Sequence, residues 1–330
     1  MVLPSILPPL PFKKKRLLAA VSGGSDSMAL LRLLAAHPAL GPSRLTAIHM
    51  NYGLRGRESL RDEALVRKTC LQLGVPLRVR RIRKPRRFPP GLSLQDWARK
   101  ARYGYFAQAA RQSRAWGCAT AHHLEDQAET VLDRVIRGAG IRGLGAMREI
   151  TVLRTGSGPL KVWRPLLGFP KGDLRAFLET LPQAWREDRS NRSVDYRRNF
   201  LRRDILPRLR RLNPDLDHGL ARLAETAAAE DAWMDQAARE ASRKLLAKRG
   251  KRFLHIKCGP YARLPLGLRR RVARLFAEGL NLDARGLKFD RLEDIRKVWE
   301  GLKRGPCDLG YGLTAFRSGA QAGLRLSDDL

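Results

Sequence analysis

The chain has few cysteines and no long apolar run, and each shortage excludes a class of protein. Its 330 residues include four cysteines, none in a Cys-x-x-Cys pair: Cys70, Cys118, Cys258 and Cys307. This scatter argues against a zinc ribbon, an iron–sulfur cluster or a disulfide framework and is typical of a reducing compartment. The N-terminal stretch MVLPSILPPLPFKKKR is apolar first and basic afterwards, the reverse of a secretory signal. No apolar run approaches the roughly 20 residues of a membrane span, so we expect a cytoplasmic protein with no membrane partner.

Acidic residues are scarce as well. Lys and Arg number 65 against 32 Asp and Glu, which gives a formal net charge of +33. An excess of this size favours a polyanionic partner, and RNA or DNA accounts for it better than a membrane surface does. The plainer interpretation is a compositional bias toward arginine.

Strand-like and helix-like patterns alternate through the first half of the chain. We expect strands at 17–21, 45–50, 77–82 and 118–121, and helices at 26–37, 58–73, 93–115 and 125–137. Such alternation predicts parallel strands joined by helical crossovers. The expected fold class is therefore α/β, a Rossmann-like doubly wound parallel sheet.

The alternation ends after residue 138. A hairpin is expected at 150–153 and 160–163, and Asn213-Pro214 begins a long helix that reaches about residue 248. A small C-terminal α+β domain follows from about residue 251. Trp233 in the long helix and Trp299 in that domain have helical spacings typical of core residues. We expect a catalytic domain at 1–212, and a linker helix with a C-terminal domain at 213–330.

The stretch AVSGGSDSMALL, residues 20–31, places a small polar segment between a strand and a helix. A glycine-rich turn there directs backbone N–H groups at one point, which makes a phosphate site. Asp26 lies inside the turn, and a carboxylate beside a phosphate is unfavourable unless a divalent cation such as Mg²⁺ lies between them. The sequence thus predicts a pyrophosphate–magnesium site. An ordinary strand-to-helix turn with serine capping is the alternative.

The segment SGGSDS resembles the Ser-Gly-Gly-x-Asp-Ser loop of the PP-loop ATP pyrophosphatase superfamily. The resemblance implies cleavage of ATP between its α and β phosphates and adenylation of a substrate oxygen. It implies that the phosphates are held by Ser22, Gly23, Gly24, Ser25, Asp26 and Ser27. The superfamily includes GMP synthetase, tRNA thiolases and tRNA(Ile)-lysidine synthetase, among which the loop does not choose.

A second group of polar residues follows the fourth expected strand. His122 and His123 fall at its carboxyl end, where open α/β sheets bind ligands. On the helix that begins there, Asp126 and Glu129 are three residues apart, so their carboxylates share one face. Like charges so placed repel unless a cation lies between them. A solvated acidic first turn, favourable to the helix dipole, is the alternative.

This segment and several others, in order over most of residues 17–210, resemble the tRNA(Ile)-lysidine synthetase family. The matching segments are HHLEDQAET, NYGLR after the second strand, the Ala-Arg…Arg-Tyr helix, RPLL and WREDRSN…RRNFLRRDILP. Two positions depart from the family pattern. Tyr52 stands where histidine is usual and is given no proton-transfer role. Glu125 stands where a second aspartate is common, which leaves Asp126 as the safer metal ligand.

The resemblance implies that ATP adenylates the C2 oxygen of the wobble cytidine in a tRNA(Ile) with a CAU anticodon. Free L-lysine then attacks C2 and expels AMP, giving lysidine. The implied catalytic residues are Asp26, Asp126 and Glu129, with Asp26 and Asp126 as Mg²⁺ ligands. Asp126 and Glu129 would hold the lysine, and Arg99 is a candidate for a phosphate or the lysine carboxylate. A solvated helix-face arginine is the alternative for Arg99.

Two basic runs are candidates for tRNA binding. One lies within residues 78–88 and the other within 197–212, and either could follow a phosphate backbone. The candidate residues are Arg78, Arg80, Arg81, Arg197, Arg198, Arg202 and Arg203. Solvated faces are the alternative. The sequence leaves the oligomeric state open, with a homodimer as one arrangement.

Three other functions are less well supported. A tRNA thiolase usually needs paired cysteines, and these four are scattered. An amidotransferase such as GMP synthetase acts on a small acceptor, which leaves the charge of +33 unexplained. A non-enzymatic RNA-binding protein has no use for Asp26 inside an anion-binding turn.

Overall fold

The computed structural model describes residues 7–53, 56–82, 93–186, 196–280, 288–310 and 312–327. Contacts divide the chain into two compact units, residues 1–228 and 229–330. The division falls inside one helix, α10 (Leu216–Leu245), which contributes residues to both units.

The N-terminal unit is built on a six-stranded sheet in the order β3-β2-β1-β4-β6-β5. Every neighbouring pair is parallel except β5 and β6, which form the expected hairpin. The strands are β1 (Arg16–Ala20), β2 (Leu45–Asn51), β3 (Leu77–Arg81), β4 (Ala115–Ala119), β5 (Ile150–Thr155) and β6 (Gly158–Trp163). This arrangement confirms the doubly wound α/β fold. The expected start of β4 at residue 118 is wrong, because Ala115 already pairs with Arg16.

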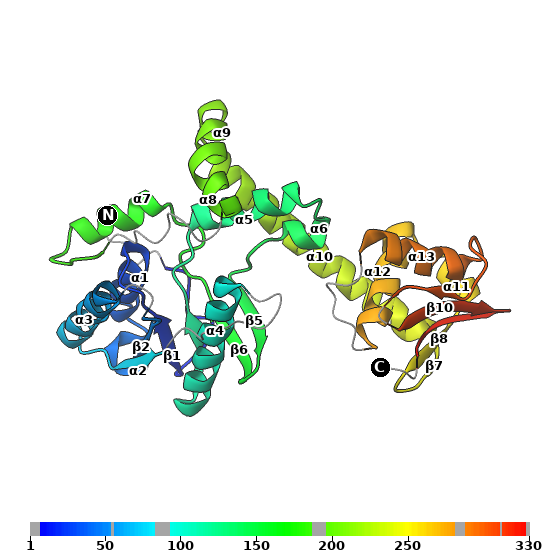
Figure 1. Ribbon diagram of the computed structural model, residues 1–330, viewed down its shortest axis with the longest axis horizontal. Helices are drawn as coiled ribbons and strands as arrows, with labels where there is room; N and C mark the ends of the chain where they lie inside the picture. The colour runs from blue at the N-terminus through cyan, green and yellow to red at the C-terminus, as the bar shows by residue number, and fades with distance from the viewer. Residues whose placement is uncertain are drawn as a thin grey trace. The chain divides into compact units, whose positions relative to one another are not determined.

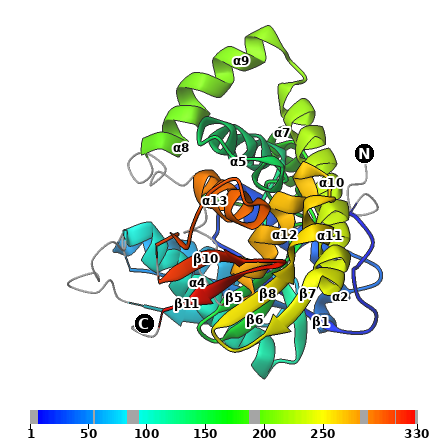
Figure 2. The same cartoon turned by 90° about the vertical axis from the view of Figure 1, so that its right-hand side faces the viewer.

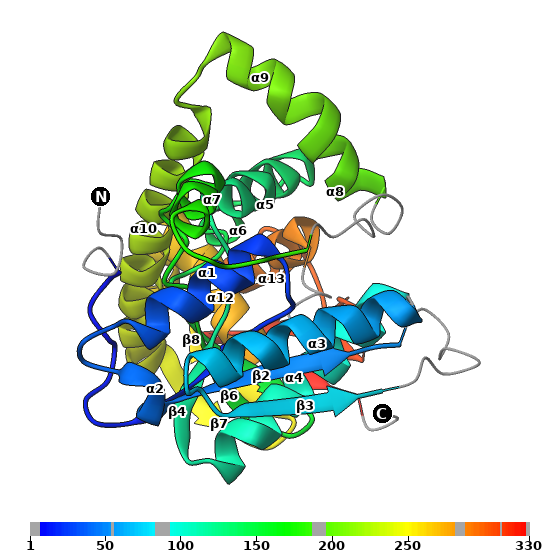
Figure 3. The same cartoon turned by 90° about the vertical axis from the view of Figure 1, so that its left-hand side faces the viewer.

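Helices cover both faces of this sheet (Figures 1 and 3). Leu17 and Ala19 of β1 pack into a core with α1 (Ser25–Ala35), α3 (Arg57–Gln72) and α7 (Lys171–Glu179). Leu18, which points the other way, packs with α4 (Leu94–Gln112). In α4, Ser93 accepts a hydrogen bond from the Asp96 N–H, the expected start of that helix. Short α2 (Gly41–Arg44) precedes β2.

The chain reverses its winding direction between β1 and β4. From β1 the sheet grows through β2 to β3 on one side, while β4 and β6 lie on the other. Ligands of open α/β sheets bind at such a switch point, beyond the carboxyl ends of the strands. Helix α1 follows β1 there, and α5 (Leu124–Ile136) follows β4. The topology therefore brings the two polar segments singled out in the sequence to one edge.

The rest of the N-terminal unit is helical. Helix α6 (Ile141–Leu144) follows α5, and the basic run after residue 196 forms α8 (Tyr196–Phe200), a π-helical turn η3 (Leu201–Ile205) and α9 (Leu206–Leu212). The wide turn η3 contacts α5. Among the described residues, no helix is long and apolar enough to cross a membrane.

The C-terminal unit has an antiparallel sheet in the order β7-β8-β11-β10-β9 (Figure 2). One face packs against the helices in a core that includes buried Trp299. The elements are β7 (Leu246–Arg249), β8 (Phe253–Lys257), α11 (Cys258–Ala262), α12 (Leu266–Glu278), α13 (Phe289–Glu300), β9 (Cys307–Asp308), β10 (Leu313–Ser318) and β11 (Gln321–Leu326).

Of the two tryptophans expected in the core, only Trp299 is there. Trp233 is 67% exposed, so that prediction is wrong. The inward face of α10 is set by Asp231 and Asp235, which bind the buried Arg271, and by Ala238 in the core. Position 233 lies off this face of the helix.

Candidate active site

The turn between β1 and α1 is held by its own hydroxyl groups. Ser27 Oγ accepts from the N–H groups of Ser22 at 3.0 Å and Gly23 at 3.2 Å and donates to the Gly24 carbonyl at 3.0 Å. Gly23 has a φ of +99°, and a Cβ there would lie 3.5 Å from the backbone oxygen of Asp62, so glycine suits this position. The turn is therefore shaped before any ligand binds.

Helix α1 begins without a side-chain cap. Its N-cap residue is Gly24, and no side chain caps the helix there. Uncapped N–H groups at a helix N-terminus, together with the helix dipole, attract an anion. The N–H groups of Ser22, Gly23 and Gly24 donate to hydroxyls of the turn itself, so the N–H groups that remain for an anion are those of the first turn of α1.

Asp26 lies in the first turn of α1, and its side chain is 27% exposed. Its Oδ1 accepts a hydrogen bond from Ser25 Oγ at 3.0 Å. Its Oδ2 lies 3.6 Å from Lys171 Nζ and 3.7 Å from His123 Nε2. Asp26 therefore faces two positive or protonatable groups from α7 and from the start of α5.

His123 joins the two polar segments. Its Nε2 lies 3.4 Å from Asp126 Oδ2, besides its contact with Asp26, and its Nδ1 lies 2.9 Å from Glu125 Oε2. Burial disfavours the imidazolium, but the Glu125 hydrogen bond and the charges of Asp126 and Asp26 outweigh it and raise the pKa of His123. One imidazole thus lies between carboxylates from α1 and α5.

Glu125 has a structural role. Both of its carboxylate oxygens lie 3.0 Å from the backbone N–H of Lys171, at the start of α7. Burial opposes its charge, yet the hydrogen bonds from His123 and Lys171 lower the pKa of Glu125. With its oxygens engaged in this way, Glu125 positions α7 and His123.

Asp126 and Glu129 face two arginines rather than open solvent. Arg198 of α8 lies 3.0 Å from Asp126 Oδ1 and 3.0 Å from Glu129 Oε2. Arg202 of η3 lies 3.2 Å from Asp126 Oδ1, and its Nη2 is 2.9 Å from Glu129 Oε2. Burial opposes the Asp126 charge, but the two histidines and two arginines lower its pKa. The carboxylates expected to hold lysine and two of the arginines expected to hold RNA therefore form one cluster.

The second histidine is buried among charges of both signs. His122 Nδ1 lies 2.9 Å from Thr120 Oγ1. Burial is the main cause that lowers the pKa of His122 to about 4; the Asp126 carboxylate opposes this shift, and the charges of Arg164, Arg198 and Arg99 add to it. His122 is therefore neutral at pH 7.

Two of the arginines near His122 differ in exposure. Arg99 is exposed, with its guanidinium carbon 4.9 Å from the centre of the Tyr103 ring. Arg164 is buried and donates to the Arg148 carbonyl at 2.7 Å and to Thr151 Oγ1 at 3.0 Å. Within the described part of the chain, Arg164 Nε has no hydrogen-bond partner.

The remaining candidate arginines lie elsewhere. In β3, Arg81 forms a bidentate pair with Glu63, Arg78 donates to Gln112 at 3.2 Å, and Arg80 lies 6.0 Å from the Tyr105 ring. Arg81 is the main cause that lowers the pKa of Glu63 to about 2. The rest of that basic run, residues 83–88, lies outside the described residues. Arg197 lies 2.7 Å from Asp133, and Arg203 is exposed.

Three residues at this edge escaped the sequence analysis. Lys171 contacts Asp26, but nothing in the sequence near it signals that contact. Arg186 donates its backbone N–H to the Gly23 carbonyl at 3.1 Å and binds Asp62 at 2.8 Å, and its place in the WRED segment was the available signal. Gln127 binds the N–H and carbonyl of Met147, which anchors the glycine-rich loop after α5.

The residues at the turn fit a Mg²⁺ ion that is held mainly by the phosphates of a bound substrate and by few protein groups. Within the described ranges, no three His, Cys, Asp or Glu side chains are placed to hold a metal. Mg²⁺ is commonly bound by one or two carboxylates together with substrate phosphates and water. Asp26, partly exposed beside the uncapped start of α1, suits this role. Asp126 suits it less, since its oxygens already face His123, Arg198 and Arg202.

A family model described as a PP-loop domain matches residues 4–209. The chain is 35% identical to a tRNA(Ile)-lysidine synthase of Geobacter sulfurreducens, over 86% of this chain and 59% of that protein. It is 38% identical to the one of Chlorobaculum tepidum, over 66% and 64%, and 35% identical to the one of Thermus thermophilus, over 93% and 56%. The chain thus spans less than two thirds of the length of these relatives.

Among solved structures, the chain is similar to a U34-tRNA thiolase of Methanococcus maripaludis. The TM-score is 0.55 at 19% identity, and the match covers 65% of this chain and 73% of the thiolase. At that identity the likeness supports the fold alone.

Proposed function

Because the chain belongs to the PP-loop domain family, we propose that its Ser22–Ser27 turn binds ATP and that the ATP activates a tRNA base. The uncapped start of α1 and the turn fixed by Ser27 support binding of the β and γ phosphates. The partly exposed carboxylate of Asp26 beside them would hold Mg²⁺. The bound cation would stabilise the charge that develops on the departing pyrophosphate.

The reaction we propose is lysidine formation on tRNA(Ile) with a CAU anticodon, in the cytoplasm. The C2 oxygen of the wobble cytidine attacks the α phosphorus of ATP, and pyrophosphate leaves. The ε-amine of free lysine then attacks C2, and AMP leaves with the oxygen. The similarity to tRNA(Ile)-lysidine synthases of three bacteria supports this choice of substrate.

The carboxylates on α5 are the candidates for holding lysine. Asp126 and Glu129 offer negative charge beside His123, at the edge where Asp26 would place the nucleotide. Arg198 and Arg202 neutralise these carboxylates, and we propose that they position them for the ammonium group of lysine. Lysine must lose a proton before it attacks, and a carboxylate or the released phosphate would accept that proton. Exposed Arg99 stays a candidate for the lysine carboxylate or a phosphate.

The C-terminal unit would contribute to tRNA binding through the outer face of its sheet. His255, Gly323 and Phe316 are aligned across three strands, and the rings of Phe253 and Phe316 lie 5.4 and 5.3 Å from that of His255. Lys248 Nζ lies 5.7 Å from the Phe253 ring. Aromatic rings beside cations on a sheet face favour stacking of unpaired bases. The basic runs in β3 and α8–η3 stay candidates for contact with phosphates.

The rival function of a tRNA thiolase is disfavoured by the thiols. Cys70, Cys118 and Cys258 are buried, and burial raises the pKa of Cys70 to about 11 and raises those of Cys118 and Cys258 too. The fourth, Cys307, is partly exposed but stands in β9 of the C-terminal unit, far in the sequence from the other three. A sulfur-transfer enzyme that uses a cluster needs several cysteines together, which these four do not provide.

One observation carries the proposal: Asp26 from the turn and Asp126 from α5 both lie within 4 Å of His123 Nε2. The nucleotide-binding turn and the acidic helix therefore share one edge, as a two-step reaction on one base requires.

The direct test is to incubate the purified chain with ATP, Mg²⁺, labelled lysine and a CAU-anticodon tRNA transcript. Label should enter the RNA, with release of AMP and pyrophosphate. A transcript with a different wobble base is the control and should take up none. Absence of label from both transcripts under conditions where ATP binds would contradict the proposal.

A further inference from the structure

The opposite end of the parallel sheet carries a basic hollow that the proposed reaction does not use. The hollow has a volume of 610 Å³ and lies at the amino ends of β1 and β4. Its lining residues are Lys14, Lys15, Arg16, Ser113, Arg114, Ala115, Trp116 and Lys161. A second hollow of 390 Å³ adjoins it, shares Arg114, Trp116 and Lys161, and adds Arg111. We call the two together the amino-end hollow.

Charge in the amino-end hollow is of one sign. Six lysines and arginines line it, and none of the described lining residues is a carboxylate. The C-terminal end of α4 reaches the hollow at Ser113, but a helix dipole supplies only about half an elementary negative charge. Most of the positive charge is therefore uncompensated and favours a polyanion.

One wall of the hollow is formed by Trp116, the one aromatic residue among its described lining residues. The rings of Trp116 and Phe12 lie 5.1 Å apart, and Lys161 Nζ is 5.3 Å from the Trp116 ring. A nucleotide chain has a partner for each of these groups: its phosphates for the cations, and its ribose or base for the partly buried indole. A small inorganic anion would leave this wall without a contact.

The backbone fixes two of the cations in an unusual conformation. Lys14 and Arg114 both have a φ of +49°, in the left-handed region that side chains other than glycine, asparagine and aspartate seldom adopt. Both residues line the hollow. Such conformations cost about 1 kcal/mol or more, and they recur at binding sites.

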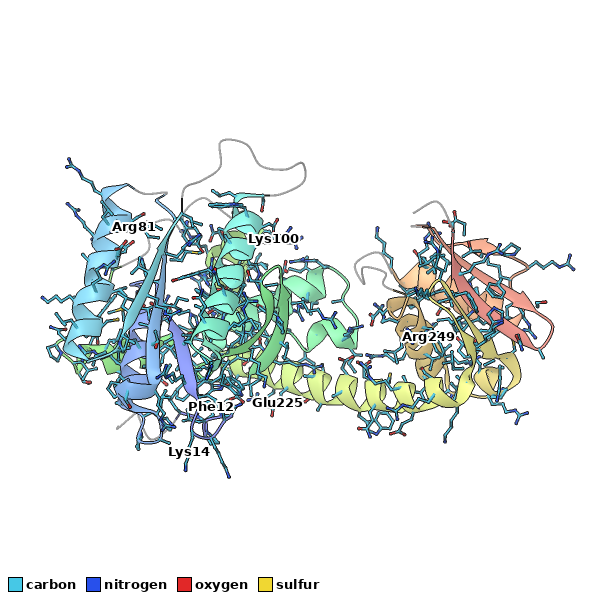
Figure 4. The ribbon with its side chains drawn as sticks, turned by 90° about the horizontal axis from the view of Figure 1, so that it is seen from below. Phe12, Lys14, Arg81, Lys100, Glu225 and Arg249 are labelled. Carbon is cyan, nitrogen blue, oxygen red and sulfur yellow. The ribbon has the colours of Figure 1, made fainter. Side chains whose placement is uncertain are left out.

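The amino-end hollow is separate from the candidate active site. The five residues of β1 place the two ends of that strand ~17 Å apart, so one phosphate group cannot reach both. Figure 4 shows the separation, with Lys14 at one end of the strands and Arg81 of β3 at the other.

We propose that the amino-end hollow is a second RNA-binding surface that holds the phosphate backbone of the tRNA without reading its sequence. This inference rests on the proposed function only in taking RNA as the partner. Phosphate contacts of this kind add affinity and orientation but no base specificity. They would hold a part of the RNA distant from the reacting base.

The test measures RNA binding by fluorescence anisotropy as a function of salt. The triple variant Lys14→Asn, Arg114→Asn and Lys161→Gln removes three charges, and asparagine tolerates the positive φ at the first two positions. A matched control removes three exposed charges from α3: Arg57→Gln, Arg61→Gln and Lys68→Gln. Equal melting temperatures of the three proteins establish that all are folded.

The expected result is a loss confined to the hollow variant. Its log–log salt slope should fall by about 2–3, at about 0.7–0.9 for each phosphate contact, and its affinity at 100 mM salt should fall roughly tenfold or more. The loss should be the same for the CAU transcript and for a transcript with another wobble base. The control should keep the wild-type slope.

Three outcomes would overturn the inference. One is an unchanged slope in the hollow variant, and another is an equal loss in the α3 control, which would indicate a diffuse field. The third is a loss of binding to inorganic tripolyphosphate with unchanged RNA binding, which would assign the hollow to a small free anion. If the wild-type protein forms no lysidine but the salt slopes of the wild type and the hollow variant still differ, only the proposed function is contradicted.

Discussion

At the carboxyl end of the parallel sheet three arginines pair with carboxylates, whereas at the amino end no described residue that lines the hollow is an acid. Arg186, Arg198 and Arg202 each lie within 3.0 Å of a carboxylate oxygen. The lining of the amino-end hollow, as far as the structure describes it, includes no carboxylate. Positive charge near the candidate active site is thus used to hold the site together. The positive charge available to a polyanion lies in the amino-end hollow. A count of basic residues cannot distinguish paired arginines from unpaired ones.

Replacing Asp26 should have the largest effect, and it should affect the carboxyl end of the sheet but not the amino-end hollow. Asp26→Ala should slow adenylation on the order of 10²–10³-fold, because the departing charge loses its stabilisation. RNA affinity should stay within about twofold, since the amino-end hollow is untouched. A single-turnover assay of AMP formation measures the first quantity. Asp173→Ala, which removes an exposed carboxylate from the first turn of α7, is the control; similar rates in both variants would remove Asp26 from the site.

Breaking the acid–arginine cluster should affect stability at the carboxyl end. Glu129→Gln leaves Arg198 and Arg202 with less compensation and should lower the free energy of unfolding by about 1–3 kcal/mol. The lower part of that range allows for solvent screening, because the arginine side chains are 46% and 34% exposed. Urea denaturation measures the change. A double variant with Arg202→Gln tests the pairing. If Arg202→Gln lowers the free energy of unfolding as much in the Glu129→Gln background as in the wild type, the two residues do not interact.

The histidines predict a pH dependence at the carboxyl end. The pKa of His122 is lowered to about 4 from 6.5, so its contribution to stability is present above pH 6.5 and is lost as the pH falls toward 4. The loss has a limiting slope of about 1.4 kcal/mol for each pH unit. The pKa of His123 is raised, so its contribution is present below pH 6.5 and is lost as the pH rises. Thermal unfolding of wild type and His122→Asn across pH 4–6.5 checks the first statement, and parallel curves would contradict it.

A single change in the amino-end hollow should have the smallest effect. Lys161→Gln should lower the log–log salt slope of RNA binding by about 0.7–0.9, the share of one phosphate contact, and leave ATP binding unchanged. Lys68→Gln on α3 is the matched control. A slope equal to that of wild type would show that Lys161 does not contact phosphate.

The sequence predicted what depends on local pattern. The Ser22–Ser27 turn, its helix and the acidic face of α5 are each contained within a few residues. The strand–helix alternation predicts parallel strands, whose carboxyl ends lie at one edge of the sheet. The meeting of these segments at that edge was therefore foreseeable, whereas the strand order and its switch point between β1 and β4 came from the structure.

What the sequence could not reveal depends on pairs far apart in the chain. Arg202 and Glu129 are separated by 73 residues, so two oppositely charged runs were each interpreted as facing a ligand. Lys171 is brought to Asp26 by α7, and Glu125 fixes that helix through a backbone N–H group. Trp233 was misplaced for a related reason, because Arg271 of α12 decides which face of α10 is buried. The basic residues 14–16 line the amino-end hollow together with Arg114 and Lys161, which are distant in the sequence, so the sequence alone does not indicate this hollow.

The π-helical turn η3 marks a place where one residue more than an α-helix needs has been accommodated. In a regular α-helix one added residue would turn everything beyond it by about 100°, the angle between successive residues. The wide turn η3 takes up that residue locally, so α8 before it and α9 after it continue nearly in phase. The turn therefore acts as a spacer that lengthens the chain by one residue while the helices on either side keep their faces.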